Sequence, residues 1–243
     1  MPQFFLPAET LRRDPIVLRG PDARHIASVL RLQVGERLVL CDGEGTRYLA
    51  CIAAMQPLRV TCTVVRQLPA ATMPVHLTLA AAIIRPERYE WLIEKAFELG
   101  CRRLIPLTTE RSVAKYLPKR PEAKLARWRE IAMAAAKQSG LPWRPDIAPI
   151  AALPDVIAAA PTMYYCWEGT ALAQDKPPRL LEHSRGKSPV ILIGPEGGFT
   201  TAEHDAVMAC RPQLVRLGPL ILRTETAAIA AVTLVQNAYR YFA

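Results

Sequence analysis

From about residue 75 onward, short apolar runs alternate with longer amphipathic stretches, and this alternation constrains the possible fold most strongly. The predicted strands, in chain order, are Val75–Ile83, Arg103–Leu107, Met163–Trp167, Val190–Ile193 and Leu214–Leu217. The predicted helices are Pro86–Leu99, Pro121–Ser139, Ala202–Cys210 and Thr224–Tyr241. Buried strands that are joined through helices are typical of a parallel sheet covered on both faces. The pattern predicts an α/β domain over residues 75–243.

The first 70 residues have a different pattern, in which short apolar runs are separated by turn residues. The predicted strands are Gln3–Leu6, Ile16–Arg19, Arg37–Cys41, Tyr48–Ala54 and Val60–Arg66. A single helix is predicted from Asp22 to about Leu30, because Pro21-Asp22 is a helix-start signal. The segment 67–74 contains two prolines and no periodicity, which indicates a linker. Residues 1–70 are therefore predicted to form a small β-rich domain.

The positive charge of the chain is concentrated in one region. The net charge is +9, and residues 102–145 contain eleven Lys or Arg against three Asp or Glu. Trp128 and Trp143 are interleaved with these cations. This concentration favours a track for a phosphate backbone, although a solvated helix face is the alternative interpretation.

The cysteines and the N-terminus suggest a cytoplasmic protein. None of the six cysteines stands in a Cys-x-x-Cys pair or at ligand spacing from a histidine, so reduced thiols are expected and a metal site is not. The N-terminal residues do not resemble a secretory signal, and no apolar run is long enough to span a membrane.

The strongest candidate for a ligand site is the segment 191–203, with the sequence Ile-Leu-Ile-Gly-Pro-Glu-Gly-Gly-Phe-Thr-Thr-Ala-Glu. An apolar strand leads into a glycine-rich turn and then into a helix. Ligands of open α/β sheets bind at the carboxyl ends of strands, where glycines allow close approach of the backbone. The turn lacks the Gly-Lys-Ser/Thr ending of a phosphate-binding P-loop. A tight turn without a ligand is the alternative interpretation.

A second candidate is the segment 217–227, with the sequence Leu-Gly-Pro-Leu-Ile-Leu-Arg-Thr-Glu-Thr-Ala. Thr224 is predicted to be the N-cap of the last helix, which places Glu225 in its first turn. The alternative is ordinary helix capping, with Arg223 paired to a carboxylate. Two glycine-bearing loops after two late strands favour one shared pocket.

These two segments closely resemble the C-terminal signatures of the bacterial 16S ribosomal RNA uridine N3-methyltransferases, the RsmE family of the SPOUT class. The resemblance extends to Arg24-His25 with Val29-Leu30-Arg31, to Glu98-Leu99-Gly100, and to Glu110-Arg111-Ser112. The chain departs from the family at Arg85-Pro86, where Lys-Gly is usual, near Leu141, and at Leu220, and each departure removes or moves a positive charge.

The resemblance implies a PUA-like β-barrel RNA-binding domain followed by a SPOUT methyltransferase domain with a C-terminal trefoil knot. It implies S-adenosyl-L-methionine as the cofactor and a uridine of 16S rRNA, at position 1498, as the target, within naked RNA or the 30S subunit. A homodimer without metal is also implied. The methyl group would pass directly to N3, mainly through positioning and electrostatics.

The resemblance also implies roles for individual residues. Arg223 would stabilise the anionic uracil and Glu225 would accept its proton. Trp167-Glu168-Gly169-Thr170 would supply a third wall of the cofactor pocket. The residues expected to bind the cofactor are Ile193, Gly194, Pro195, Glu196, Gly197, Gly198, Leu217, Gly218, Leu220, Ile221, Leu222 and Thr226. The residues expected to contact RNA are Arg24, His25, Arg31, Arg111 and Lys115. His204 is expected to be exposed on its helix.

Two alternatives remain at this stage. The first is a related SPOUT methyltransferase that modifies another base, because target choice depends on shape. The second is a non-catalytic RNA-binding or ribosome-assembly factor with a vestigial pocket.

Overall fold

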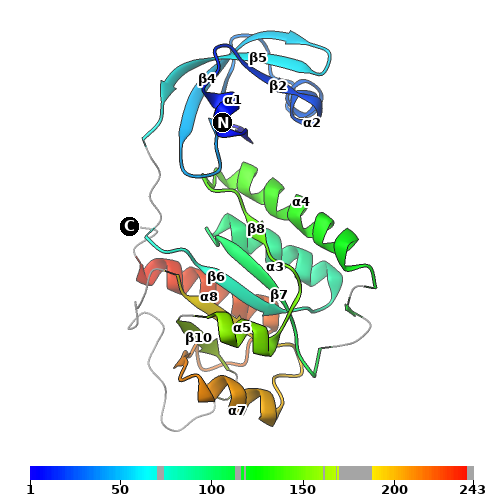
Figure 1. The fold of residues 1–243 in the computed structure, drawn as a ribbon, viewed down its shortest axis with the longest axis vertical. Coiled ribbons are helices and arrows are strands. Elements are labelled where there is room, and N and C mark those ends of the chain that lie inside the picture. The colour runs from blue at the N-terminus through cyan, green and yellow to red at the C-terminus, as the bar shows by residue number, and fades with distance from the viewer. Residues whose placement is uncertain are drawn as a thin grey trace. The chain divides into compact units, whose positions relative to one another are not determined.

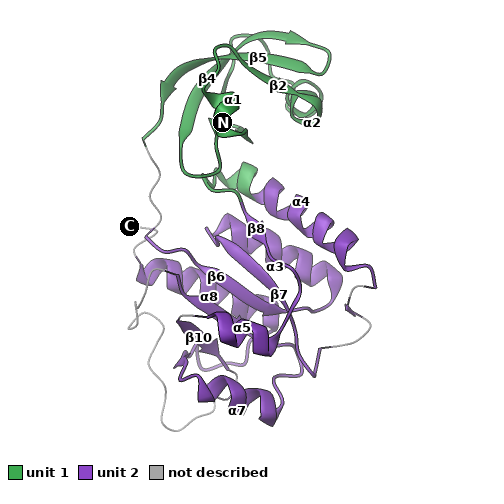
Figure 2. Cartoon of the chain, viewed as in Figure 1, with its two compact units in different colours: residues 1–72, 136–144 green, residues 73–135, 145–243 purple. Residues whose placement is uncertain are grey.

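In the computed structural model, the chain folds into two compact units (Figure 2). The structure describes residues 1–69, 74–112, 116–117, 119–160, 162–167, 169 and 188–239. The first unit contains residues 1–72 and Ala136–Arg144, and the second contains Met73–Ala135 and Pro145–Ala243. The sequence predicted domains over residues 1–70 and 75–243, and it did not predict that Ala136–Arg144 groups with the first unit. The limits of the two domains stay a prediction.

The first unit is built on a mixed sheet (Figure 1). Its strands are β1 (Gln3–Phe5), β2 (Ile16–Arg19), β3 (Arg37–Cys41), β4 (Arg47–Gln56) and β5 (Arg59–Gln67). Their order in the sheet is β1-β3-β4-β5-β2, and only β1 and β3 pair in parallel among them. The five predicted strands are therefore confirmed to within one or two residues at most ends.

The helices of this unit differ from the prediction of a single helix. The predicted helix from Asp22 is divided into α2 (Gly20–Arg24) and a π-helical turn, His25–Val29. An additional short helix, α1 (Ala8–Leu11), was not predicted, because its four residues are too few to show helical periodicity. The core of the unit includes Phe4, Leu18, Ile26 and Leu40, all at most 1% exposed.

The second unit is an α/β layer structure, as predicted. Its strands are β6 (Thr78–Ala82), β7 (Arg103–Thr108), β8 (Asp146–Ile147), β9 (Ala151–Ala152), β10 (Met163–Cys166), β11 (Val190–Ile193) and β12 (Gln213–Leu214). The sheet order is β12-β10-β11-β6-β7-β8, with β9 also paired to β7, and all of these pairings are parallel. Because β10 and β11 are adjacent and parallel, the segments that follow Cys166 and Ile193 begin side by side.

The helices confirm the predicted alternation. They are α3 (Pro86–Glu98), α4 (Pro121–Ser139), α5 (Leu153–Ala159), α7 (Thr201–Ala209) and α8 (Thr224–Ala238). The sequence did not predict α5, β8 or β9, because each is too short to show a period. None of the described helices combines the length and apolar character needed to cross a bilayer.

Two tryptophans that the sequence assigned to an RNA track are instead core residues. Trp128 is 1% exposed, and its ring centroid lies 4.9 Å from that of the buried Tyr89. Trp143 is 8% exposed, in the segment that joins the first unit. Trp128 lies on the inward face of α4, whereas Arg127 and Arg129 on the same helix are exposed. The interpretation of these two residues as RNA contacts was wrong.

Candidate functional site: a pocket between two glycine-bearing loops

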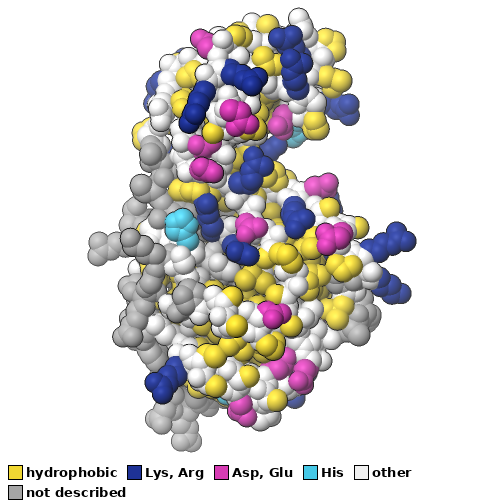
Figure 3. Space-filling view, viewed as in Figure 1, with side chains coloured by type: hydrophobic (Ala, Val, Ile, Leu, Met, Phe, Trp, Pro, Cys, Tyr) yellow, Lys and Arg dark blue, Asp and Glu magenta, His cyan; other side chains and the backbone are white. Residues whose placement is uncertain are grey.

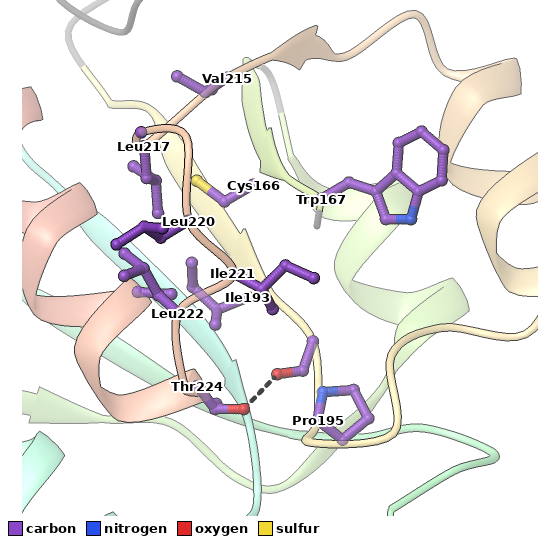
Figure 4. Close-up of a pocket in the computed structure, with 13 residues that line it drawn as sticks. Cys166, Trp167, Ile193, Pro195, Val215, Leu217, Leu220, Ile221, Leu222 and Thr224 are labelled. Carbon is purple, nitrogen blue, oxygen red and sulfur yellow. Dashed lines mark hydrogen bonds between the residues drawn. The ribbon is translucent and has the colours of Figure 1, made fainter. Parts of the chain in front are cut away.

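A pocket lies at the carboxyl ends of β10 and β11, where the two predicted loops meet (Figure 4). Its walls are the first glycine loop (residues 194–199), the second glycine loop (residues 217–223) and the end of β10. The lining residues are Cys166, Trp167, Ile193, Gly194, Pro195, Val215, Leu217, Gly218, Leu220, Ile221, Leu222, Thr224 and Ala227. The lining is mainly apolar side chains and backbone, which suits a flat, uncharged ring bound by peptide groups.

The first glycine loop is a tight turn that is fixed at several points. Gly198 has a φ of +68°, and its N–H donates to the Pro195 carbonyl over 2.9 Å. At the end of the loop, Thr200 and Glu203 form a reciprocal capping box that starts α7. The Glu203 carboxylate also accepts a hydrogen bond from the Glu110 backbone N–H over 2.8 Å. These hydrogen bonds within the protein fix the conformation of the turn without a bound ligand.

We expect Gly194→Ala to lower the free energy of unfolding by about 1–3 kcal/mol. A Cβ at Gly194 would stand 2.7 Å from the Phe199 ring, which is buried and cannot move freely. Gly197→Ala is the matched control, since its Cβ would lie 3.5 Å from that of Arg111, an ordinary contact. Urea unfolding of both variants checks this expectation, and equal stability of the two would contradict it.

The second glycine loop presents backbone and apolar side chains to the pocket. Gly218 has a φ of +152°, and no described atom lies within 4 Å of the place where its Cβ would stand. Leu220 and Ile221 line the pocket while remaining 72% and 63% exposed. Large apolar side chains that stay this exposed indicate a surface that a ligand or a partner covers.

One hydrogen bond joins the two loops directly. The Thr224 hydroxyl donates to the Gly194 carbonyl over 3.0 Å (Figure 4). The sequence predicted Thr224 as the N-cap of the last helix, but the N-cap is Arg223, and no side chain caps that end. The prediction was wrong because the Thr224 side chain serves the neighbouring loop instead of its own helix.

The third wall is the end of β10, where Cys166 and Trp167 line the pocket. The indole of Trp167 packs against the ring of His204 of α7, with a centroid distance of 4.3 Å and an interplanar angle of 40°. His204 Nδ1 lies 3.2 Å from the Tyr165 hydroxyl. His204 is thus partly buried, where the sequence suggested an exposed residue. Of the predicted third wall, Glu168 and Thr170 lie outside the described residues.

We expect Cys166→Ala to keep the turnover of a reaction in this pocket within about threefold of the wild type. Burial raises the pKa of the Cys166 thiol to about 12, so it stays protonated at neutral pH and is not a nucleophile. Single-turnover kinetics of the two proteins check this expectation. A loss of several orders of magnitude would instead indicate a covalent step through the thiol.

The two predicted catalytic residues lie in different surroundings. Arg223 is exposed, and its side chain forms no ion pair among the described residues. Glu225 is 12% exposed; its Oε1 lies 3.7 Å from Arg88 Nε, and its Oε2 is buried without a hydrogen-bond partner in the described part of the chain. Arg88 also binds Glu196 Oε1 over 2.9 Å. The sequence did not identify Arg88, because an arginine near a helix start carries no distinctive signal.

Eight of the twelve predicted cofactor residues line the pocket, and four do not. Those in the lining are Ile193, Gly194, Pro195, Leu217, Gly218, Leu220, Ile221 and Leu222. Outside it, Glu196 pairs with Arg88, the Gly197 carbonyl accepts from Arg111, and Gly198 closes the turn. Thr226 lines a separate shallow depression beside Glu225 and Trp91.

The predicted RNA-binding residues are mostly exposed. Arg24 and His25 are exposed where α2 becomes the π-helical turn, and Arg31 is exposed with a φ of +54°. Arg111 is exposed in the second unit, where its guanidinium donates to the Gly197 carbonyl over 3.0 Å. Lys115 lies outside the described residues.

A second cavity of about 550 Å³ lies between α5, α7 and the end of β7. Apolar side chains gather over this region of the second unit (Figure 3). Two acidic residues, Glu110 and Glu203, are in its lining, and the Glu203 carboxylate already accepts hydrogen bonds from the backbone N–H groups of Glu110 and Thr200. The rest of the lining is mainly apolar, so this cavity offers few groups to a polar ligand.

The residues of the first pocket fit an adenosine-type cofactor. Its apolar walls suit a purine ring, and its exposed peptide groups can supply hydrogen bonds to ring nitrogens and ribose hydroxyls. Gly218 is part of the lining, and the open space at its Cβ position lets a ligand approach the backbone there.

Comparison with known proteins agrees with this geometry. Residues 71–236 match the family model described as RNA methyltransferase domain, and residues 18–65 match RNA methyltransferase PUA domain. The chain is 32% identical over 89% of its length to ribosomal RNA small subunit methyltransferase E of Mycobacterium bovis, covering 84% of that protein. The corresponding Bacillus subtilis protein is 28% identical over 89% of this chain and 87% of its own length.

Solved structures show the same fold. Ribosomal RNA small subunit methyltransferase E of Neisseria gonorrhoeae, bound to S-adenosyl methionine, superposes with a TM-score of 0.82 at 28% identity, covering 98% of this chain and 97% of that one. A putative methyltransferase of Legionella pneumophila, in complex with the bound cofactor SAM, also has a TM-score of 0.82, at 27% identity with 97% of each chain covered. The pocket between the glycine loops therefore lies in a chain that belongs to the ribosomal RNA small subunit methyltransferase E family, with an RNA methyltransferase domain and a PUA domain.

Proposed function

We propose that this protein transfers a methyl group from S-adenosyl-L-methionine to N3 of a uridine in 16S rRNA, at position 1498. The observation that carries the proposal is the pocket in which both glycine loops meet beside Arg223. Membership of the family and the cofactor named for the Neisseria gonorrhoeae relative support the same reaction. The target atom and position rest on the family resemblance of the two loop sequences.

The cofactor, when bound, supplies an electrophilic methyl group on a sulfonium. The protein must then hold the uracil so that N3 faces that group, which accounts for much of the rate gain. N3 carries a proton at neutral pH, and this proton has to leave before the nitrogen lone pair can attack. The residues beside the pocket therefore have two tasks, which are to stabilise the uracil anion and to accept its proton.

Arg223 is the proposed anion-stabilising residue. It lies between Leu222 and Thr224, which both line the pocket, and its guanidinium is free of carboxylate partners among the described residues. Glu225 is the proposed proton acceptor, because its Oε2 has no hydrogen-bond partner among those residues. Glu225 faces α3 rather than the pocket lining, so the proton would leave from that side.

We expect RNA binding to weaken steeply with salt, and Arg31→Ala to reduce the magnitude of the slope of log K against log salt by about 1. Arg31 is exposed and is expected to contact one phosphate. Without that contact, RNA binding releases one counterion fewer, and the salt dependence becomes weaker. Arg12→Ala, which removes an exposed arginine outside the predicted RNA-binding set, is the control. Filter-binding titrations at several salt concentrations measure both slopes, and equal slopes would contradict the assignment of Arg31.

A cytoplasmic homodimer is part of the proposal. Trp91 on α3 and Leu220 and Ile221 of the second glycine loop are large apolar side chains with 45%, 72% and 63% exposure. Their exposure supports burial against a second copy of the chain. Sedimentation equilibrium tests this point, and a monomer at micromolar concentration would contradict it.

The direct test of the function uses labelled cofactor and 30S particles from a strain that lacks the modification. The proposal predicts label on N3 of the uridine at position 1498. Label on another base would identify a related RNA methyltransferase with a different target. Absence of both transfer and cofactor binding would favour a ribosome-assembly factor.

A further inference from the structure

We propose that Arg88 is a positioning residue that holds the two walls of the cofactor pocket together through Glu196 and Glu225. This inference rests on the proposed function, since it concerns the affinity of the same pocket for its cofactor. Arg88 does not line that pocket, so it would act through the two carboxylates and not by touching the cofactor.

The geometry brings three chain segments to one guanidinium. Arg88 is in the first turn of α3, Glu196 belongs to the first glycine loop, and Glu225 lies in the first turn of α8. The Nη1–Oε1 distance to Glu196 is 2.9 Å, and the Nε–Oε1 distance to Glu225 is 3.7 Å. A planar guanidinium can face two carboxylates at once, whereas an ammonium group acts as a single point charge.

Both carboxylates stand next to residues that form the pocket. Glu196 directly follows Pro195, and Glu225 directly follows Thr224, the residue whose hydroxyl binds the Gly194 carbonyl. Arg88 therefore links the same two segments as the Thr224–Gly194 hydrogen bond. The two links together fix the spacing between the pocket walls.

Burial of Glu225 makes the Arg88–Glu225 half of this link stronger than an ordinary surface pair. The Arg88 side chain is 34% exposed, Glu225 only 12% and Glu196 40%, whereas both members of the neighbouring pair, Arg85 and Glu87, are more exposed, at 60% and 76%. Exposed pairs contribute little, but a charge left partly buried without its partner is costly. Loss of Arg88 would leave two carboxylates facing a site without a cation, so the first glycine loop and α8 would move apart.

The test measures S-adenosyl-L-methionine binding by calorimetry on the full chain. Arg88→Ala is expected to weaken binding about tenfold, and Arg88→Lys about threefold, because lysine can serve only one carboxylate. Arg85→Ala, in the adjacent exposed pair, is the control and should stay within about twofold. Thermal unfolding of each variant shows whether it is folded before binding is measured.

A double-mutant cycle separates positioning from general stability. If Arg88 acts through Glu196, the effects of Arg88→Ala and Glu196→Gln will not add. Wild-type affinity in Arg88→Ala, an equal loss in Arg85→Ala, or strict additivity in the cycle would each overturn the inference. If Arg88→Ala does not fold, an affinity of Arg88→Lys equal to wild type would overturn it as well. A wild-type protein that fails to bind the cofactor would overturn the proposed function instead.

Discussion

Gly218→Val is expected to weaken S-adenosyl-L-methionine binding by at least about 100-fold, which corresponds to about 2.7 kcal/mol. Gly218 lines the pocket, and no described atom lies within 4 Å of the new Cβ, so the valine side chain is expected to occupy space that the cofactor needs. The φ of +152° also disfavours a β-branched residue, so the loop would distort as well. Isothermal titration calorimetry measures the loss.

The control for this variant is Gly140→Val. Gly140 has a φ of +73° and open space around its Cβ position, but it belongs to the first unit, whereas the pocket is lined by residues of the second. The Gly140→Val variant should therefore have a lower melting temperature, because valine is strained at this φ, but it should keep the cofactor affinity of the wild type. Equal affinities of the two valine variants would mean that the ligand does not approach Gly218.

Arg223→Ala is expected to lower kcat by about 10²–10³ while cofactor affinity stays within about threefold. The charge that Arg223 would stabilise develops on the uracil during the reaction, so its loss acts on the transition state more than on cofactor binding. Because Arg223 makes no ion pair among the described residues, its removal should leave the fold undisturbed. Single-turnover kinetics at saturating cofactor measure the effect.

Two further variants define the role of Arg223. Arg223→Lys keeps the positive charge but replaces the planar guanidinium with an ammonium group, so its kcat should lie between those of Arg223→Ala and the wild type. Arg211→Ala removes an exposed arginine just after α7 and should retain wild-type kcat. A normal kcat in Arg223→Ala would remove this residue from the mechanism.

The long and strongly patterned elements of the fold were predictable from the sequence. Val190–Ile193 is a short apolar run between Pro189 and Gly194, which predicts a buried strand, and all four of its residues are buried in the sheet. The helix Pro121–Ser139 was placed correctly because proline favours a helix start and Gly140 follows its end. Short elements such as Asp146–Ile147 form because the neighbouring strand β7 offers free backbone groups, and no local sequence signal shows this.

The candidate site was predictable in its backbone but not in its side-chain partners. The glycines and the strand–turn–helix pattern located both loops, because they are local features of the chain. The bond from Thr224 to Gly194 and the contacts of Arg88 with Glu196 and Glu225 join residues far apart in the sequence. Such partners depend on how strands are ordered in the sheet, which single-residue patterns do not reveal. The contact between the rings of Trp167 and His204 was missed for the same reason.

The most direct test of the account is a crystal structure of this protein grown with S-adenosyl-L-methionine. Electron density for the cofactor is expected between residues 193–195 and residues 217–222, next to Gly218. Density in the apolar cavity between α5 and α7, with the two glycine loops unoccupied, would contradict it.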